Sequence, residues 1–445
     1  MRIGFVSLGC VKNQVNTEQM IYLVKNAGYE VTGEVEDTDA VIINTCGFIE
    51  SAKAEAINYI IELGQLKSEG KIGKLIVTGC LAQRYTDEIL EELPEVDAVV
   101  GTGSYDDIVN VLERVFEGQR PVEKGDIHAP VSEAGRVLTT PEYYAYIRIA
   151  EGCDNWCAYC VIPSLRGRYR SRPMDKVVEE AELLAANGVK ELIVVAQDIT
   201  RYGTDTDGKP MLAELLRRLC RIEGFTWVRL HYMYPDMFND ELIEVIANEP
   251  KIVKYLDIPI QHINDRILKA MRRRGTGDDI RRLFRKLREN IPGVVLRTSL
   301  IAGLPGETEE EFEELCQFLR EAKIERAGVF AFSPEEGTPA AEMPDQVDEE
   351  TKERRVELIT DIQSRIMDEY NELRMDTVMK VLCEGYDDFA ECYYGRSYAD
   401  SPDIDGKVFV NAPKGSITPG EFIDVLITDT IDGDLIGEIN NDDCE

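Results

Sequence analysis

At the centre of the sequence stands Glu151-Gly152-Cys153-Asp154-Asn155-Trp156-Cys157-Ala158-Tyr159-Cys160, directly after the apolar run Tyr143-Tyr144-Ala145-Tyr146-Ile147-Arg148-Ile149-Ala150. The cysteines are spaced Cys-x3-Cys-x2-Cys, so they share one short loop at the end of an expected strand. Three thiolates leave a four-coordinate site incomplete, whereas a structural zinc site usually has four protein ligands. Such a loop suits a four-iron four-sulfur cluster whose last iron is open to a substrate. A zinc site completed from elsewhere and thiols without metal are the alternatives.

Around this loop, the segment from Tyr143 to about Asp361 alternates strands with amphipathic helices. The pattern predicts strands at residues 143–150, 191–196, 227–232, 254–258, 294–302 and 326–332, and helices such as 174–187, 211–221, 278–290 and 308–322. Six such units predict a partial (β/α)6 barrel and are too few for an eight-fold one. The loops at the carboxyl ends of barrel strands are where chemistry collects, and the cysteine loop follows the first strand.

The first 120 or so residues show the same alternation, with strands expected at 2–8, 40–44, 74–78 and 96–100. The pattern predicts an α/β fold with a doubly wound parallel sheet. Three strands run straight into a cysteine, in Ser7-Leu8-Gly9-Cys10, Ile43-Asn44-Thr45-Cys46 and Val77-Thr78-Gly79-Cys80. Ligands of open α/β sheets bind beyond the carboxyl ends of the strands, so these thiols predict a second incomplete cluster site. Burial of the cysteines as ordinary core residues is the alternative.

The remaining stretches are expected to form a linker, a charged helix and a third domain. Residues 121–142 are expected to form a linker with one short strand, and His128 within it a surface residue. A charged helix is expected from about Glu349 to Arg374, followed by short strands between turns, which predict a C-terminal antiparallel β-barrel. The expected domains are therefore 1–120, the linker 121–142, 143–373 and 374–445.

Composition restricts the possible partners. The 445 residues carry a net charge of -34 and have no apolar run long enough to span a bilayer. Eleven cysteines, six of them in ligand-like settings, fit a reducing cytoplasm better than a disulfide scaffold. From Met375 to Glu445 there are four Lys and Arg against seventeen Asp and Glu, whereas an RNA-binding barrel is expected to be basic. The charge favours a basic partner, or it serves solubility alone.

Polar residues follow other expected strands of the partial barrel. Gln197, Gln261, His262 and Arg297 are candidate contacts for a polar cofactor or substrate, although such residues also serve turns and caps. The stretch Leu165-Arg166-Gly167-Arg168-Tyr169-Arg170-Ser171-Arg172-Pro173 either binds an anionic group or neutralises neighbouring acidic residues. The basic residues of Met271-Arg272-Arg273-Arg274 and Arg281-Arg282 are expected on solvated helix faces.

With these motifs the whole chain resembles the radical S-adenosylmethionine methylthiotransferase family, and the Cys153 loop has the spacing of radical S-adenosylmethionine enzymes. The resemblance implies three domains, the last of them a TRAM barrel, and two 4Fe-4S clusters. It assigns Cys10, Cys46 and Cys80 to the auxiliary cluster, and Cys153, Cys157 and Cys160 to the radical-generating one. It also implies that S-adenosyl-L-methionine is both substrate and source of a 5′-deoxyadenosyl radical, with an electron donor as a partner.

Within that family the sequence is more similar to the RimO type than to the tRNA-modifying type. Three stretches carry this likeness: Ser7-Leu8-Gly9-Cys10-Val11-Lys12-Asn13, Ile162-Pro163-Ser164-Leu165-Arg166-Gly167, and Gly395-Arg396-Ser397-Tyr398-Ala399-Asp400-Ser401-Pro402-Asp403-Ile404-Asp405-Gly406. Val11 and Asn16 depart from the usual proline and aspartate. The RimO type implies methylthiolation of an aspartate β-carbon in the twelfth protein of the ribosomal small subunit, with no direct tRNA binding. A tRNA adenosine methylthiotransferase and a non-catalytic iron–sulfur electron carrier are the alternatives.

Overall fold

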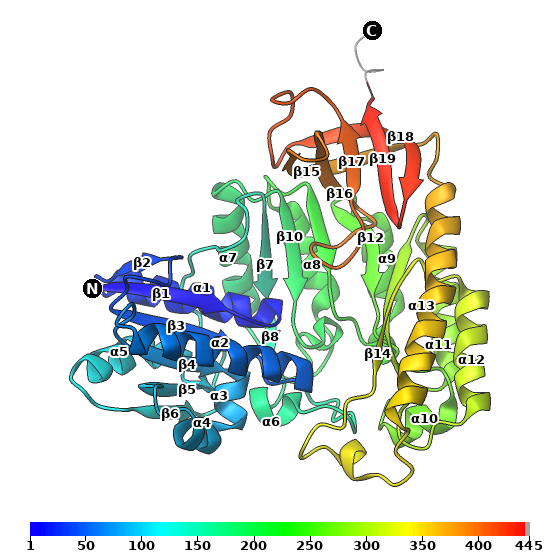
Figure 1. The fold of residues 1–445 in the computed structure, drawn as a ribbon. Coiled ribbons are helices and arrows are strands. Elements are labelled where there is room, and N and C mark those ends of the chain that lie inside the picture. The colour runs from blue at the N-terminus through cyan, green and yellow to red at the C-terminus, as the bar shows by residue number, and fades with distance from the viewer. Residues whose placement is uncertain (441–445) are drawn as a thin grey trace.

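The computed structural model describes residues 1–440. Its first unit is a parallel sheet with the strand order β2-β1-β3-β4-β5-β6 (Figure 1). Its strands are β1 Arg2–Ser7, β2 Glu30–Thr32, β3 Ala40–Thr45, β4 Leu75–Gly79, β5 Ala98–Gly103 and β6 Val122–Gly125. Its helices are α1 Val11–Asn26, α2 Glu50–Ser68, α3 Cys80–Arg84, α4 Thr86–Glu92 and α5 Ile108–Phe116, with the 3-10 turn η1 Tyr105–Asp107. Strand β2 was not predicted, because three residues are too few to show alternation.

Both faces of this sheet are covered. Met20 of α1 and Val111 of α5 pack on one face, while Ala56 and Ile60 of α2 pack on the other. The doubly wound arrangement is therefore confirmed. The edge strand β6 pairs with β5 and is the short strand expected within residues 121–142, so it extends the first sheet into that stretch.

The second unit is a six-stranded parallel sheet with the order β14-β13-β12-β11-β10-β7. Its strands are β7 Tyr144–Arg148, β10 Glu191–Val195, β11 Trp227–Leu230, β12 Ile252–Asp257, β13 Val295–Ala302 and β14 Arg326–Ala331, and the short strands β8 Ala150–Glu151 and β9 Arg170–Ser171 pair separately. Its helices are α6 Ile162–Arg166, α7 Met174–Ala186, α8 Leu212–Arg221, α9 Asp240–Asn248, α10 Asp265–Ala270, α11 Gly277–Asn290, α12 Glu309–Ala322 and α13 Glu349–Glu372, with the 3-10 turns η2 Ile199–Arg201, η3 Pro235–Met237 and η4 Pro339–Glu342. This is the partial (β/α)6 arrangement expected from the sequence.

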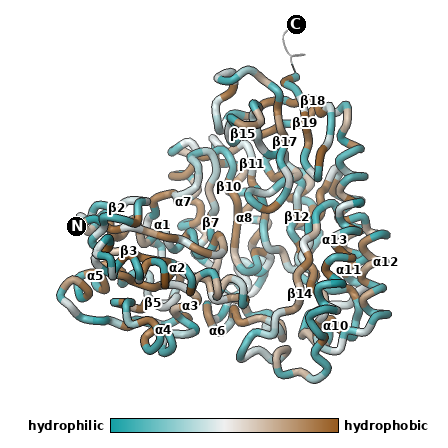
Figure 2. Tube along the Cα trace, viewed as in Figure 1, coloured by the Kyte–Doolittle hydropathy of each residue, from teal (hydrophilic) through white to brown (hydrophobic). Residues whose placement is uncertain are grey.

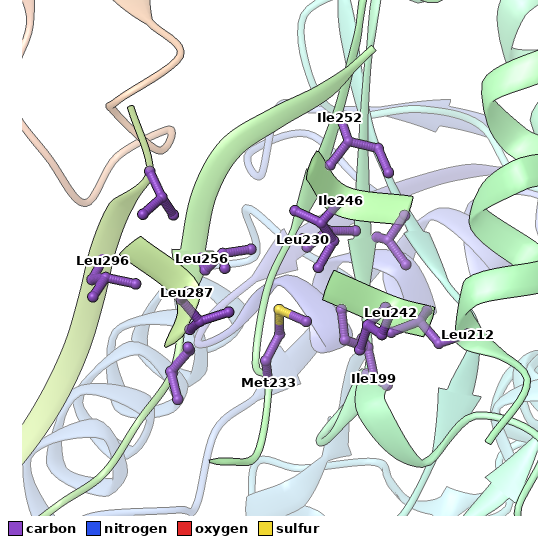
Figure 3. Packing of buried hydrophobic residues seen from close by; sticks show 14 of the residues in the cluster. Ile199, Leu212, Leu230, Met233, Leu242, Ile246, Ile252, Leu256, Leu287 and Leu296 are labelled. Carbon is purple, nitrogen blue, oxygen red and sulfur yellow. The ribbon is translucent and has the colours of Figure 1, made fainter. Parts of the chain in front are cut away.

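The main core lies between the second sheet and its helices. Leu230 and Leu256 from neighbouring strands meet Ile246 of α9, and Leu296 of β13 lies near Leu287 of α11 (Figure 3). All five side chains are completely buried. Each such residue contributes about 1.5–3 kcal/mol by leaving water, so this core gives the cysteine loop a rigid support.

The third unit is a closed barrel with the order β15-β16-β17-β19-β18. Its strands are β15 Val378–Asp387, β16 Cys392–Ser397, β17 Val408–Asn411, β18 Phe422–Ile431 and β19 Asp434–Ile439. The barrel is antiparallel except for one pair: β17 and β19 run parallel. The expected C-terminal barrel is therefore confirmed, with a parallel β17–β19 pair because the β18–β19 hairpin places β19 beside β17. The last five residues of the expected domain 374–445 lie outside the described ones.

Helix α13 connects the second unit to the barrel along one side of the molecule (Figure 1). Hydrophobic and hydrophilic segments alternate along it, as expected for a helix with one buried face (Figure 2). The barrel docks through Glu191 at the amino end of β10, which is completely buried and accepts from both Arg229 and Arg396 at 2.7 Å. In the described part of the chain, no helix is both long and apolar enough to cross a membrane.

Candidate active site

The loop of Cys153, Cys157 and Cys160, here called the radical cradle, is fixed by main-chain contacts. The Cys153 amide donates to Gly167 O at 3.1 Å, and the Ala158 amide donates to Met271 O at 3.0 Å. Gly152 has a φ of +82°, and a Cβ there would lie 2.0 Å from Arg168 O, so only glycine fits. The loop is therefore held at both ends before any metal binds.

The thiols of the radical cradle are close enough to disfavour one another's ionisation. Burial raises the pKa of Cys153 to about 12, and the neighbouring Cys157 thiol adds to this rise. Burial likewise raises the pKa of Cys160, with Cys157 and Cys153 contributing. Buried thiols that disfavour each other's ionisation need a cation to become thiolates, and an iron cluster supplies this charge. The residues present thus fit a cluster.

Arg273 belongs to this site, contrary to its expected place on a solvated helix face. It lies in the turn after α10, where it is partly buried, and does not lie on a solvated helix face. Its Nη1 is 3.8 Å from Cys157 Sγ and 3.4 Å from Tyr159 Oη, and its guanidinium lies 4.2 Å from the Tyr234 ring centroid. A positive charge is therefore fixed beside one thiol of the radical cradle.

Arg274 is also engaged, since it donates to Asn155 in the cradle loop at 2.7 Å. Arg272 is exposed, and Arg282 lies on the exposed face of α11 as expected. No pattern near residue 272 revealed which arginine turns inward, because the contact joins segments more than a hundred residues apart.

The auxiliary cradle consists of Cys10, Cys46 and Cys80. Cys10 precedes α1, Cys46 follows β3, and Cys80 begins α3 after β4. The register pairs Ser7 with Asn44 and Thr45 with Gly79, so the three strands end at the same edge of the sheet. The structure thus brings together three thiols that are far apart in the sequence.

Glycine makes this close approach possible. A Cβ on Gly9 would lie 2.6 Å from Cys46 Cβ and 3.1 Å from its sulfur. Gly79 has a φ of +102°, and a Cβ there would lie 2.4 Å from Asn44 Oδ1. The small residues noted in the sequence are therefore required by the backbone beside the thiols.

The surroundings of the auxiliary thiols shift their pKa values in different directions. Burial raises the pKa of Cys46 to about 11, and the thiols of Cys80 and Cys10 add to the rise. Packing against protein atoms opposes ionisation of Cys10, but Lys12 and Arg166 outweigh it and lower the pKa of that thiol. The auxiliary cradle therefore has cationic support that the sequence motif did not reveal, and it too fits an iron cluster.

Helix α6 joins the two cradles. It begins two residues after Cys160 and ends at Arg166, whose Nη2 lies 3.5 Å from Cys80 Sγ. The same guanidinium is buried and donates to Asn16 at 2.9 Å, and also to Asn13. One short helix therefore connects a ligand position of the radical cradle with one of the auxiliary cradle.

Glu151 connects this arginine to the radical loop. Its carboxylate accepts from Arg148 at 2.7 Å, from Arg166 at 3.1 Å and from Gln197 at 2.5 Å. Burial opposes its ionisation, but Arg166 and Arg148 outweigh that effect and lower the pKa of Glu151 to about 2. The carboxylate is therefore ionised and holds both guanidinium groups in place.

A second connection between the units lies at Glu335, in the loop after β14. Its carboxylate accepts from Arg84 at 3.0 Å and from the Glu50 amide, the first of α2, at 3.0 Å. Arg84 ends the helix that Cys80 begins, and it also donates to Gly47 O at 2.9 Å. Two segments of the auxiliary cradle are thus tied to the second unit.

The structure places the four predicted cofactor contacts in different local settings. Gln197 binds Glu151 beside the radical loop, and Gln261 lies at the end of β12 with a φ of +70°. His262 is buried, with its Nδ1 accepting from the Asn264 amide and its pKa lowered to about 3 by burial. Arg297 forms an ion pair with Asp257 at 2.7 Å.

The arginine-rich stretch is largely engaged within the protein. Arg172 is buried and pairs with Glu133 and Glu180, and Arg166 takes the contacts described above. Arg168 is exposed, and His128 beside it is exposed as expected. Arg172 therefore neutralises neighbouring acidic residues, whereas Arg166 is part of the candidate active site.

No group of three or more His, Cys, Asp and Glu side chains within residues 1–440 is tight enough to hold a single metal ion. A four-iron cluster places its ligands farther apart than a single ion does. All ten described cysteines are free thiols.

Family models match three parts of the chain. The Radical SAM superfamily matches residues 147–319, the Uncharacterized protein family UPF0004 matches residues 2–101, and the TRAM domain matches residues 377–439.

Curated relatives match over nearly the whole length. A protein of Lachnoclostridium phytofermentans named "Ribosomal protein uS12 methylthiotransferase RimO" is 48% identical and covers 98% of this chain and 99% of its own. Proteins with that name from Pelotomaculum thermopropionicum and Geobacter sulfurreducens are 50% and 49% identical, over 98% of this chain in both cases and 99% and 98% of their own.

Solved structures share the fold. The radical S-adenosylmethionine methyltransferase TsrM of Kitasatospora setae, with cobalamin and a [4Fe-4S] cluster bound, has a TM-score of 0.57 at 18% identity and covers 76% of each chain. The cobalamin-dependent S-adenosylmethionine radical enzyme OxsB has a TM-score of 0.51 at 13% identity, over 83% of this chain and 56% of its own.

Proposed function

The chain belongs to the RimO family of radical S-adenosylmethionine methylthiotransferases, and from this premise we propose that it methylthiolates ribosomal protein uS12. The target is the β-carbon of an aspartate side chain. The observation that carries the proposal is the pair of three-thiolate cradles joined through α6 and Arg166. One cradle suffices for radical formation, whereas insertion of sulfur requires a second site that presents it.

We propose that each cradle holds one 4Fe-4S cluster. Cys153, Cys157 and Cys160 would hold the radical cluster, and Cys10, Cys46 and Cys80 the auxiliary one. When bound, these clusters and S-adenosyl-L-methionine supply a 5′-deoxyadenosyl radical that removes hydrogen, and the sulfur that is then attached and methylated. The chain's own part is to fix both sites at a constant separation, which its contacts at Arg166 and Glu335 support.

Among the predicted S-adenosylmethionine contacts, Gln197 and Gln261 are the better candidates. Gln197 touches Glu151, next to the radical loop, and its Oε1 has no protein partner. His262 and Arg297 remain proposals with a weaker basis, since Arg297 is paired with Asp257 and His262 is enclosed beside Asn264. Arg273, by contrast, can stabilise negative charge on the Cys157 side of the cluster.

The charge distribution supports a protein substrate over tRNA. The residues after Met375 hold seventeen acidic against four basic side chains, and such a surface repels phosphate while attracting basic proteins. We therefore propose that the barrel domain does not bind tRNA. An external electron donor and a reducing cytoplasm complete the proposal, because the clusters need electrons and free thiolates.

The decisive experiment compares uS12 and tRNA in a strain that lacks this protein. Mass spectrometry should show that uS12 loses an increment of about 46 Da, the mass of S plus CH2, while its tRNA is unchanged. Complementation with the wild-type chain should restore the increment, and a variant with Cys153→Ala should not. Loss of a methylthio group from tRNA, with uS12 unchanged, would contradict the proposal in favour of the tRNA-modifying activity. If neither substrate changes and no 5′-deoxyadenosine forms, an electron carrier is the better description.

A further inference from the structure

A polar cavity of about 90 Å³ has Arg166 in its wall. Parts of α1, the end of β5, the segment from Asp126 to Ser132 and the start of the second unit form its wall. A single water needs only about 10–15 Å³ of such space, so the cavity has room for a small inorganic ion.

The inner wall is rich in cations. Arg148, Arg166 and Arg170 line the cavity, and Glu151 is the carboxylate that lies buried among them. The carboxylate oxygens of Glu151 already accept hydrogen bonds from Arg148, Arg166 and Gln197. The two other acidic residues of the lining, Asp106 and Asp126, are exposed. The buried part of the wall thus carries more positive than negative charge.

Three hydrogen-bond donors of this wall lack an acceptor from the protein. They are Arg148 Nε, Arg170 Nε and the hydroxyl of Tyr105. Arg148 and Tyr105 are more than nine-tenths buried, with 3% and 7% of their surface exposed. Burial also raises the pKa of Tyr105, so its hydroxyl keeps the proton that it can donate. Buried donors without partners are rare, and three around one cavity indicate a ligand that accepts hydrogen bonds.

We infer that this cavity binds a small inorganic anion held by Arg148, Arg170 and Tyr105. Resting on the proposed function, we assign the anion as hydrosulfide, the simplest carrier of the sulfur to be inserted. An anion here would be one guanidinium away from the auxiliary cradle, because Arg166 contacts both the cavity and Cys80. Phosphate and sulfate are also small inorganic anions that accept hydrogen bonds, so the experiment must separate these sources from hydrosulfide.

Binding is tested on the holoenzyme. Crystals soaked in sodium bromide should show an anomalous peak in the cavity, within reach of Arg148 and Tyr105. Tyr105→Phe removes one donor and keeps the ring, so sulfate should bind about tenfold more weakly in calorimetry, the effect of one hydrogen bond to a charged group. The matched control is Tyr370→Phe, since Tyr370 also has a buried hydroxyl without a protein partner but lies on α13. A cavity that holds only water in the bromide crystals overturns the anion site.

The identity of the anion needs a second measurement. The apparent KM for hydrosulfide in methylthiolation should rise about tenfold in Tyr105→Phe and also rise in Arg170→Gln, but not in Tyr370→Phe. Formation of 5′-deoxyadenosine should stay unchanged in Tyr105→Phe. If phosphate occupies the cavity while the KM for hydrosulfide is the same in all variants, the assignment to hydrosulfide is overturned. A bromide peak in an enzyme that never modifies uS12 would instead overturn the proposed function and leave the anion site standing.

Discussion

The two cradles hold the same number of thiols but are built in different ways. The radical cradle is one loop whose ends are fixed by Gly167 and Met271. The auxiliary cradle joins the ends of three strands, so its shape depends on sheet register and on contacts with the second unit at Arg166 and Glu335. A local loop leaves a spacing that is readable in the sequence, whereas an assembled site depends on the whole fold. The two sites should therefore respond differently to perturbation.

The largest expected effect comes from removing either set of thiols. Iron should fall from about eight to about four per chain in both triple Cys→Ala variants, one at Cys153, Cys157 and Cys160 and the other at Cys10, Cys46 and Cys80. Only the radical-cradle variant should lose 5′-deoxyadenosine formation, because the other retains the site that cleaves S-adenosyl-L-methionine. Iron analysis and chromatography of the products check this. Unchanged iron in either variant would contradict the assignment of that cluster.

The glycines beside the thiols should show the next largest effect. Gly79→Ala places a Cβ 2.4 Å from Asn44 Oδ1, and Gly152→Ala places one 2.0 Å from Arg168 O. Each variant should lose iron from its own cradle and keep the other cluster. Gly188→Ala is the control, because Gly188 has a φ of +94° but a Cβ there would have no atom within 4 Å. This variant therefore tests backbone strain alone, which costs about 1–3 kcal/mol. Equal iron loss in the control would show that the close contacts are not the cause.

The substitution Glu335→Ala tests whether the auxiliary cradle depends on contacts with the second unit. Glu335→Ala removes the carboxylate partner of the partly buried Arg84 and frees the first amide of α2, which should cost up to about 3–5 kcal/mol in the free energy of unfolding. The radical cradle should still produce 5′-deoxyadenosine, but with less methylthiolated product for each molecule formed.

The control for Glu335 is Glu123→Ala in the first unit. Its pair with Arg114 has both side chains 32% exposed, so its loss should cost less than about 1 kcal/mol and leave the product ratio unchanged. Denaturant unfolding and the ratio of the two products check both variants. An unchanged ratio in Glu335→Ala would show that this contact does not set the separation of the cradles.

Sequence patterns predicted most of the strands and helices. The strand before Cys153, the three strands before Cys10, Cys46 and Cys80, and the helices of the second unit all form near the expected residues. Strong apolar alternation and a β-then-α order are sufficient for these elements. The three-residue strand β2 was missed because it carries no such pattern.

What the sequence could not predict are contacts between distant segments. Arg273 lies against Cys157 only because α10 ends beside the cradle loop, and a run of arginines gives no sign of which one turns inward. Arg297 stays a predicted cofactor contact at a strand end, and its ion pair with Asp257 of the neighbouring strand could not be predicted from the sequence. The stretch around Arg166 was recognised as basic, although its burial depends on the turn at Gly167, whose φ is +73°.

The smallest expected effect is an acid sensitivity confined to the unit of the radical cradle. Burial lowers the pKa of His262 to about 3, below the ordinary value of 6.5, so the unfolded chain binds a proton more readily than the folded one. The stability that neutral His262 contributes is complete above about pH 6.5 and falls as the pH drops toward 3, by up to about 1.4 kcal/mol per pH unit. His262→Gln should flatten this dependence between pH 5 and 6.5. Hydrogen exchange at these pH values should show faster opening of α10 and α12 in the wild type on acidification, with α1 and α2 unaffected. Equal acceleration in both units would mean that the acid sensitivity does not arise at His262 and that the two cradles share one unfolding unit.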